Sequence, residues 1–222
     1  MIVNENGNEI KFTMTDSLPM SGMGGTIKRT TDGDCVKLFY FNNNIYPNYK
    51  VLHKIRELDL ESLYKIKEFL FKDDVFSGYT MKYYQHDRVD ISIDKMSVFI
   101  DNMIRLYNDM MVLNDNHILM CDNCINNIVY SDKKVIIIDC DCYKFESGYK
   151  LHYTNLRLYL DLILGLLFNS TLCYSFKDVF KTHKLYKIFD METFNLDKTV
   201  KLFEGYERPI DAIRDKSLIK RI

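Results

Sequence analysis

The side chains best suited to chemistry lie in residues 119–142. Asp122 is followed five positions later by Asn127, and Asp139 stands at the end of a short β-branched stretch. A carboxylate can act as a general base or as a hard oxygen ligand for a cation. The same segment holds four thiols, which are soft ligands: Cys121, Cys124, Cys140 and Cys142. The sequence therefore places two different kinds of candidate chemistry in one short region.

The order of these residues resembles the catalytic core of the protein-kinase-like superfamily, in its small atypical bacterial or viral form. The family motif runs Asp, four residues, Asn, a strand, a turn, a second strand and a further Asp. Asp122, Asn127 and Asp139 match it. The resemblance implies that Asp122 orients an attacking hydroxyl, while Asn127 and Asp139 hold Mg²⁺ against ATP. The implied reaction transfers the γ-phosphoryl group of ATP to a hydroxyl acceptor, on a protein or a small molecule.

A glycine-rich run lies upstream, from Met20 to Ile27. Closely spaced glycines let a backbone approach phosphate oxygens and donate amides to them, and an ordinary turn explains such a run equally well. Under the resemblance, part of the run forms the family's phosphate-covering loop, with Met20 in place of its first glycine. The nucleotide-binding residues expected here are Ser21, Gly22, Gly24 and Gly25.

Lys37 stands between Val36 and Leu38, so its side chain projects from the opposite face of the predicted strand. The resemblance makes Lys37 the catalytic lysine that pairs with the phosphates, and the alternative is a solvated edge lysine. The family orients this lysine with a glutamate on the next helix. Glu57 is the candidate, although it lies near the predicted end of that helix, and a surface role is its alternative.

The predicted strand from Gly78 to Tyr84 resembles the one that enters the family's hinge between two lobes. There Met81 would line the adenine pocket. The backbone around Tyr83 would offer the donor and acceptor that adenine needs. An ordinary strand with aromatic packing is the alternative reading.

Several positions depart from the family pattern. Met120 and Cys121 replace the His-Arg before the catalytic aspartate, Cys124 replaces a lysine, and Cys140-Asp141 replaces Phe-Gly. The connection from Asp139 to the next helix is short and lacks an Ala-Pro-Glu segment, so the activation segment is expected to be reduced. A pseudokinase, which binds nucleotide or acts as a scaffold, is therefore an alternative function.

The thiols support a reading from another class. Cys121, Cys124, Cys140 and Cys142 bracket a predicted hairpin and supply four soft ligands, as in a structural zinc site. The glycines and prolines that let zinc-knuckle amides turn toward sulfur are absent. Under the kinase reading, Cys140 is a core residue.

The composition of the chain excludes several other classes of protein. The chain has 222 residues, 47% of them hydrophobic, which is enough to build a folded core. Its 30 basic and 31 acidic residues are interleaved, so nucleic-acid binding is not expected. No secretory signal and no run of about 18 apolar residues is present, so we expect a cytoplasmic protein without a membrane span.

The predicted elements indicate an α+β fold, and the resemblance implies that this fold is bilobal and protein-kinase-like. Alternation and turn signals predict hairpin strands around residues 9–14 and 35–40, and helical spacing follows over 48–70, with a break near Asp59. Further helices are predicted over 95–113 and 155–168, the second capped by Thr154 or Asn155. A single domain of residues 1–222 would comprise a mostly β N-lobe (1–81) and an α-rich C-lobe (82–222).

Overall fold

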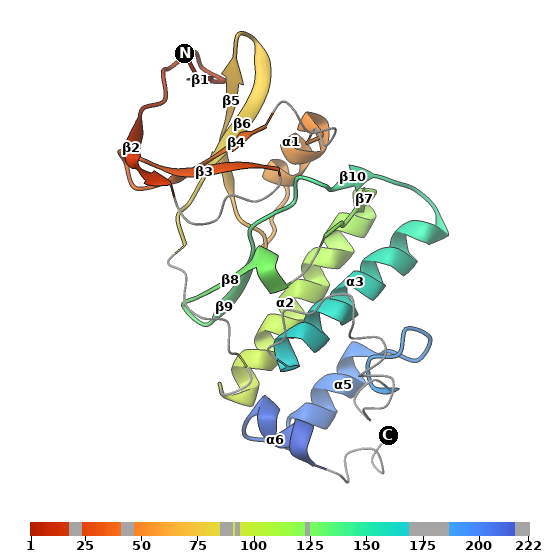
Figure 1. The fold of residues 1–222 in the computed structure, drawn as a ribbon. Helices are drawn as coiled ribbons and strands as arrows, with labels where there is room; N and C mark the ends of the chain where they lie inside the picture. Colours follow the sequence, from red (N-terminus) through yellow and green to blue (C-terminus); the bar gives the residue numbers. More distant parts are fainter. Residues whose placement is uncertain are drawn as a thin grey trace.

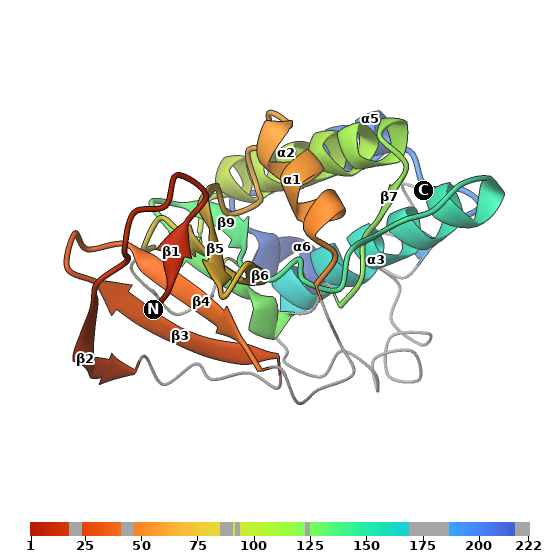
Figure 2. The same cartoon turned by 90° about the horizontal axis from the view of Figure 1, so that it is seen from above.

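The computed structural model is an α+β fold, with a β-sheet in the N-terminal part and helices in the C-terminal part (Figure 1). The N-terminus lies at the sheet (Figure 2). The structure describes residues 1–17, 24–40, 47–84, 91, 94–122, 125–168 and 187–215.

In the described residues, six strands form an antiparallel sheet in the order β1-β5-β6-β4-β3-β2. Their bounds are β1 Val3–Asn4, β2 Phe12–Ser17, β3 Gly25–Thr30, β4 Cys35–Phe39, β5 Ile66–Lys72 and β6 Val75–Met81. The predicted turn before β4 is confirmed, since Gly33 adopts a φ of 86° and donates its N–H to the Thr30 carbonyl. Strand β4 lies between β3 and β6, where Lys37 faces Ile27 on one side and Tyr79 on the other.

Helix α1 (Tyr49–Glu57) is shorter than the predicted helix. Asn48 caps its start by accepting hydrogen bonds from the N–H groups of Lys50 and Val51. The prediction that helical structure continues to residue 70 was wrong, because residues 66–72 form β5. Asp73 and Asp74 both adopt positive φ, as a tight hairpin turn requires, and this turn pairs β5 with β6. Strand pairing thus overrides the helical spacing of the apolar residues.

The C-terminal part is built around two long helices, α2 (Met96–Asp115) and α3 (Tyr149–Phe168), which lie side by side (Figure 1). The Tyr159 hydroxyl of α3 donates to the Met103 carbonyl of α2 at 3.1 Å. The shorter elements are β7 Ile118–Leu119, the 3₁₀ turn η2 Ile125–Asn127, β8 Ile128–Ser131, β9 Lys134–Ile137, β10 Lys144–Phe145, α5 Leu196–Phe203 and α6 Pro209–Arg214. Strand β8 pairs with β9 and β7 pairs with β10.

The periodicity of α2 predicted its inward face correctly. Its buried apolar residues include Met96, Phe99, Ile100, Met103, Leu106 and Met110. For α3, the predicted cap was wrong. The helix begins at Tyr149, and Asn155 lies inside it with no exposed surface.

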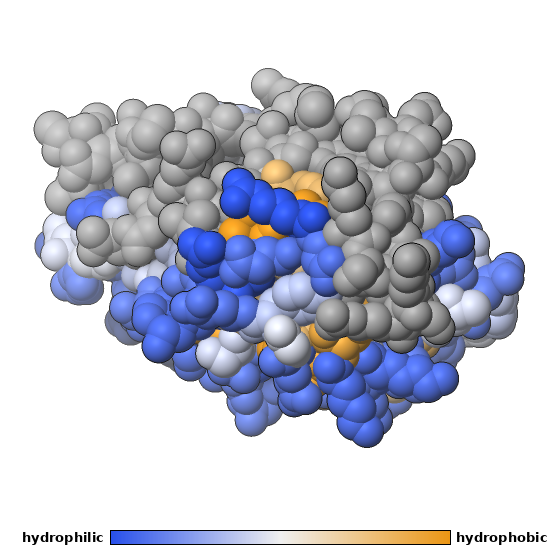
Figure 3. Space-filling model, turned by 90° about the horizontal axis from the view of Figure 1, so that it is seen from below, coloured by the Kyte–Doolittle hydropathy of each residue, from blue (hydrophilic) through white to orange (hydrophobic). Residues whose placement is uncertain are grey.

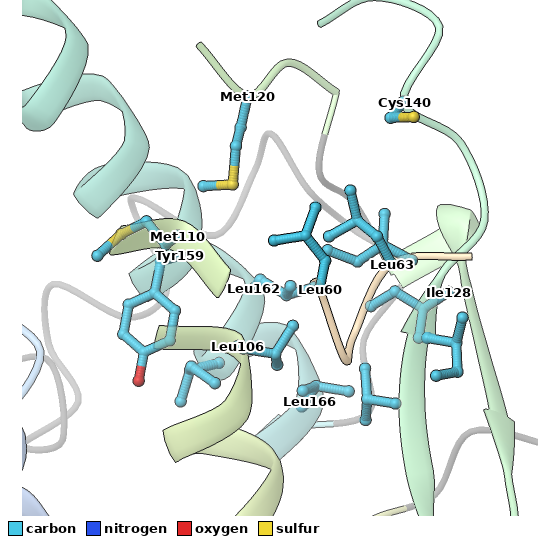
Figure 4. Close-up of a cluster of buried hydrophobic side chains, with 14 of the residues drawn as sticks. Leu60, Leu63, Leu106, Met110, Met120, Ile128, Cys140, Tyr159, Leu162 and Leu166 are labelled. Carbon is cyan, nitrogen blue, oxygen red and sulfur yellow. The ribbon is translucent and has the colours of Figure 1, made fainter. Parts of the chain in front are cut away.

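The segment between α1 and β5, residues 58–65, connects the sheet to the helical part through hydrogen bonds and apolar contacts. Ile137 of β9 donates its N–H to the Ser62 carbonyl at 2.7 Å and accepts from the Tyr64 N–H at 2.9 Å. Leu60 and Leu63 lie in an apolar cluster with side chains of α2 and α3 (Figure 4). This connection fixes β9, and therefore the residues that follow it, relative to the sheet.

When the molecule is viewed from below, relative to Figure 1, polar residues cover most of the described surface (Figure 3). Apolar atoms show there only in small areas between hydrophilic residues (Figure 3). None of the described helices is long and apolar enough to cross a membrane.

Candidate functional site

Lys37 meets two carboxylates that lie about a hundred residues away in the sequence. Its Nζ lies 2.8 Å from Asp139 Oδ2 and 2.6 Å from Asp141 Oδ2. The side chain of Lys37 is 7% exposed, so the surface-lysine alternative does not describe it. Burial acts to lower the pKa of Lys37, but the charges of Asp141 and Asp139 outweigh it and the pKa lies above its ordinary value. The ammonium is therefore held in its charged form.

Asp139 and Asp141 follow β9, which the isolated bridge between Leu63 and Ile137 joins to the segment before β5. The backbone N–H of Asp141 donates to Asp139 Oδ1 at 3.2 Å, so the two acids share a fixed local conformation. Burial raises the pKa of Asp141, while Lys37 opposes that rise. The sequence interpretation treated Asp141 as a departure from the family pattern and missed its contact with Lys37. The alternation of two acids directly after a buried strand was the available signal.

Tyr79 fixes the other oxygen of Asp141. The Tyr79 hydroxyl donates to Asp141 Oδ1 at 2.9 Å, and the Tyr79 ring stacks on the ring of Tyr64 at 5.3 Å. Tyr64 in turn contacts Cys140 through its hydroxyl, 3.2 Å from Sγ. Both tyrosines are fully buried, and burial raises their pKa values well above the ordinary range. The sequence interpretation also missed Tyr79.

Asp122 and Asn127 form a compact loop. Asp122 adopts a φ of 55°, and the Asn127 side-chain N–H donates to its backbone oxygen at 2.7 Å and to Oδ2 at 3.2 Å. The Asn127 carbonyl accepts from the Ile138 N–H at 2.8 Å. This backbone contact ties the loop to the residue directly before Asp139. The structure therefore brings together the predicted pair Asp122 and Asn127 beside the strand that delivers Asp139.

The thiol of Cys142 is affected by the charges of acids from both segments. Burial raises the pKa of its thiol to about 11, and the charges of Asp139, Asp122 and Asp141 act in the same direction. The charges of Asp122 and Asp139 therefore both act on this one thiol.

Asn155 anchors the entry to the Asp122 loop. Its side-chain N–H donates to Asn114 Oδ1 at 2.7 Å and to the Ile118 carbonyl at 2.9 Å, and its Oδ1 accepts from the Met120 N–H at 2.8 Å. All these contacts are buried. The residue predicted as a helix cap instead connects α3, α2 and the chain that leads to Asp122.

Glu57 is a correction to the sequence interpretation. It lies at the last position of α1 with a 53% exposed side chain, and its Oε1 lies 3.4 Å from His53 Nδ1. His53 and Glu57 are one helical turn apart, whereas the buried residues of α1 are Val51, Leu52 and Ile55. Glu57 therefore lies off the buried face of α1, and Lys37 pairs with Asp139 and Asp141 instead.

The glycine run is described in part. Ser21 and Gly22, like Met20, lie outside the described residues. Gly24 accepts a hydrogen bond from the Tyr40 N–H at 3.2 Å. Gly25 opens β3, and a side chain there would collide with the backbone oxygen of Leu38, next to Lys37. The close approach of β3 to β4 therefore requires a glycine at this position, whatever the loop before it binds.

The predicted hinge residues lie at the end of the sheet. Met81 is the last residue of β6 and is buried opposite Cys35 and Ile66. The ring of Tyr83 lies under the guanidinium of Arg29, 3.8 Å from its centroid. Both residues have packing roles, and their predicted contact with adenine stays a prediction.

The described thiols do not gather as a zinc site. Among the described residues, no group of three or more His, Cys, Asp or Glu side chains has an arrangement that could hold a metal ion. Cys124 lies outside the described residues. Cys140 is a buried core residue beside Tyr64, as the kinase reading predicted.

Neither a scan against protein-family models nor a search of curated proteins gave a match.

Proposed function

We propose that this chain is an ATP-dependent phosphotransferase of the protein-kinase-like type, which transfers the γ-phosphoryl group to a hydroxyl acceptor. The observation that carries the proposal is the 2.8 Å contact between Lys37 of β4 and Asp139. The resemblance assigns these residues to the phosphates and to the metal ion, and they lie 102 positions apart in the sequence. Two residues chosen for adjacent roles from the sequence are thus adjacent in space.

Asp139 and Asn127 offer oxygen atoms that suit a magnesium complex of ATP. Asp139 has a 35% exposed side chain, so its carboxylate is accessible, and Asn127 donates through its side-chain nitrogen, which leaves the amide oxygen as its ligand atom. Mg²⁺ prefers such oxygens and commonly takes one or two ligands from the protein, with phosphate and water completing its shell. A bound Mg²⁺ would offset the negative charge that develops on the transferred group. Lys37 would contribute its positive charge to the phosphates.

Asp122 is the proposed orienting residue for the acceptor hydroxyl. It is exposed, so an acceptor can reach it, and Asn127 holds its backbone oxygen and its carboxylate. A fixed carboxylate that accepts a hydrogen bond from a hydroxyl aligns that oxygen for attack on a phosphoryl group. The short connection from Asp139 to α3, residues 140–148, supports a reduced activation segment.

The order of elements also supports a bilobal kinase-like arrangement. A hairpin leads into the lysine strand, a helix and two further strands follow, and then comes a helical part that carries the Asp122 loop and the β8–β9 hairpin. The proposed N-lobe ends with β6 at Met81, the boundary predicted from the sequence.

The test incubates the purified chain with Mg²⁺ and ATP labelled at the γ-phosphate, and follows label on the protein, on added hydroxyl compounds and in free phosphate. We expect transfer that Asp122→Asn abolishes while MgATP affinity stays near that of the parent, because an orienting carboxylate acts mainly in the transition state. Asp132→Asn, in the exposed β8–β9 turn, is the matched control.

Two outcomes would change the conclusion. A folded parent that does not bind MgATP contradicts the proposal outright. MgATP binding without any transfer, in the presence of varied acceptors, would assign a nucleotide-binding protein without turnover.

A further inference from the structure

Asp141 links the sheet to the segment after β9 through both of its carboxylate oxygens. Oδ2 lies 2.6 Å from Lys37 Nζ, and Oδ1 accepts from the Tyr79 hydroxyl at 2.9 Å. Lys37 and Tyr79 are direct cross-strand partners on β4 and β6. Their side chains therefore project from the same face of the sheet and reach the same carboxylate.

We propose that Asp141 is the positioning residue of Lys37. It takes the role that the resemblance assigned to Glu57. This inference rests on the proposed function. Asp141 acts through the lysine: it holds the ammonium of Lys37 in place while that ammonium contacts the phosphates of the nucleotide.

The exposures of the two acids separate their roles. The side chain of Asp139 is 35% exposed, whereas that of Asp141 is 7% exposed. A metal ion or a phosphate can therefore approach Asp139, and Asp141 is shielded behind Lys37 and Tyr79. If Asp139 bound a metal ion, Asp141 would remain the carboxylate that contacts Lys37.

The surroundings of Asp141 are rigid, as positioning demands. Tyr79 stacks on Tyr64, and the Tyr64 N–H is bonded to the Ile137 carbonyl of β9. Tyr79 of the sheet therefore holds the carboxylate of Asp141, and the side chain of Asp139 holds its backbone N–H. Glu57 has neither property, since it is exposed and paired with His53.

The test compares Asp141→Asn with the charge-restoring Asp141→Glu and with Glu57→Gln. Asparagine keeps an oxygen that can accept from Tyr79 but has no charge for Lys37. A hydrogen bond to a charged group is worth enough to change a rate by about tenfold or more. We expect Asp141→Asn to lower single-turnover transfer by about that factor, Asp141→Glu to recover part of it, and Glu57→Gln to match the parent.

A double variant distinguishes positioning from a general structural effect. If Asp141 acts through Lys37, Asp141→Asn should add no further loss of transfer in a Lys37→Met background. A full additional loss in that background would overturn the inference. So would a folded Asp141→Asn protein that transfers at the parental rate.

A third readout needs no turnover. Without the 2.6 Å contact with Asp141, the Lys37 side chain keeps only its contact with Asp139, so it should be held less firmly and react faster with an amine-directed acylating reagent, as measured by mass spectrometry of the Lys37 peptide. Unchanged labelling contradicts the positioning role. If labelling rises in Asp141→Asn but the parent neither binds MgATP nor transfers phosphate, the proposed function fails while the Asp141 contact stands.

Discussion

Replacing Lys37 by Met should remove the charge that balances Asp141 while keeping most of the lysine stem's packing. The Lys37 and Asp141 side chains are each 7% exposed, and breaking such a buried pair from one side costs about 3–5 kcal/mol. Asp139 is 35% exposed and screened by solvent, so its ion pair with Lys37 contributes at most about 1 kcal/mol to the free energy of unfolding. We therefore expect Lys37→Met to lower the free energy of unfolding by about 3–5 kcal/mol at mildly alkaline pH.

This loss should depend on pH in a defined direction. Burial already raises the pKa of Asp141, and loss of Lys37 removes the main opposing charge. A carboxyl group whose pKa is higher in the folded than in the unfolded state binds its proton more tightly when folded. Its cost is therefore full above the folded pKa and is relieved as the pH falls through that value. The deficit of Lys37→Met should thus shrink from about pH 8 to about pH 5.

Urea unfolding followed by circular dichroism at these pH values measures the deficit. Lys134→Met, at an exposed position in β9, is the matched control. The double variant Lys37→Met/Asp141→Asn should regain much of the lost stability, because no unpaired buried charge remains at position 141. A deficit equal at both pH values, or a double variant no more stable than Lys37→Met, would refute this account of the site.

Three further predictions concern single substitutions, and the first of them rests on the proposed function. Asp139→Ala should abolish Mg²⁺-dependent ATP binding in a folded protein, because apolar carbon cannot replace a hard oxygen ligand, and unchanged affinity by calorimetry would remove Asp139 from the metal site. Asp109→Ala should lower stability by about 1–3 kcal/mol, since its carboxylate accepts from the N–H groups of Glu61 and Ser62, and an unchanged urea midpoint would contradict this. Tyr79→Phe should reduce the alkaline loss of stability: the pKa of Tyr79 is raised from 10.0, so the folded state keeps a proton that the unfolded state releases as the pH rises through 10.0, and an unchanged slope above that pH would be inconsistent with it.

Local patterns in the sequence predicted the elements that depend on near neighbours. The β8–β9 hairpin follows from two apolar runs around a polar turn, and α2 follows from apolar residues at helical spacing. Asp122 and Asn127 meet because they are five residues apart in a tight loop. In these places the interacting groups are close in sequence, so spacing carries the information.

Tertiary structure determined the contacts of those residues whose partners are distant in the sequence. Residues 66–72 became β5 because β6 was available to pair with them, despite apolar spacing that suited a helix. Lys37 pairs with Asp139 and Asp141 because the Leu63–Ile137 bridge sets β9 against the segment before β5, while α1 ends with Glu57 facing away. The sequence by itself determined which residue types were present for the site. Which acid holds the lysine depended on the bridge between Leu63 and Ile137, two residues that are distant in the sequence, and no local spacing encodes such a pairing.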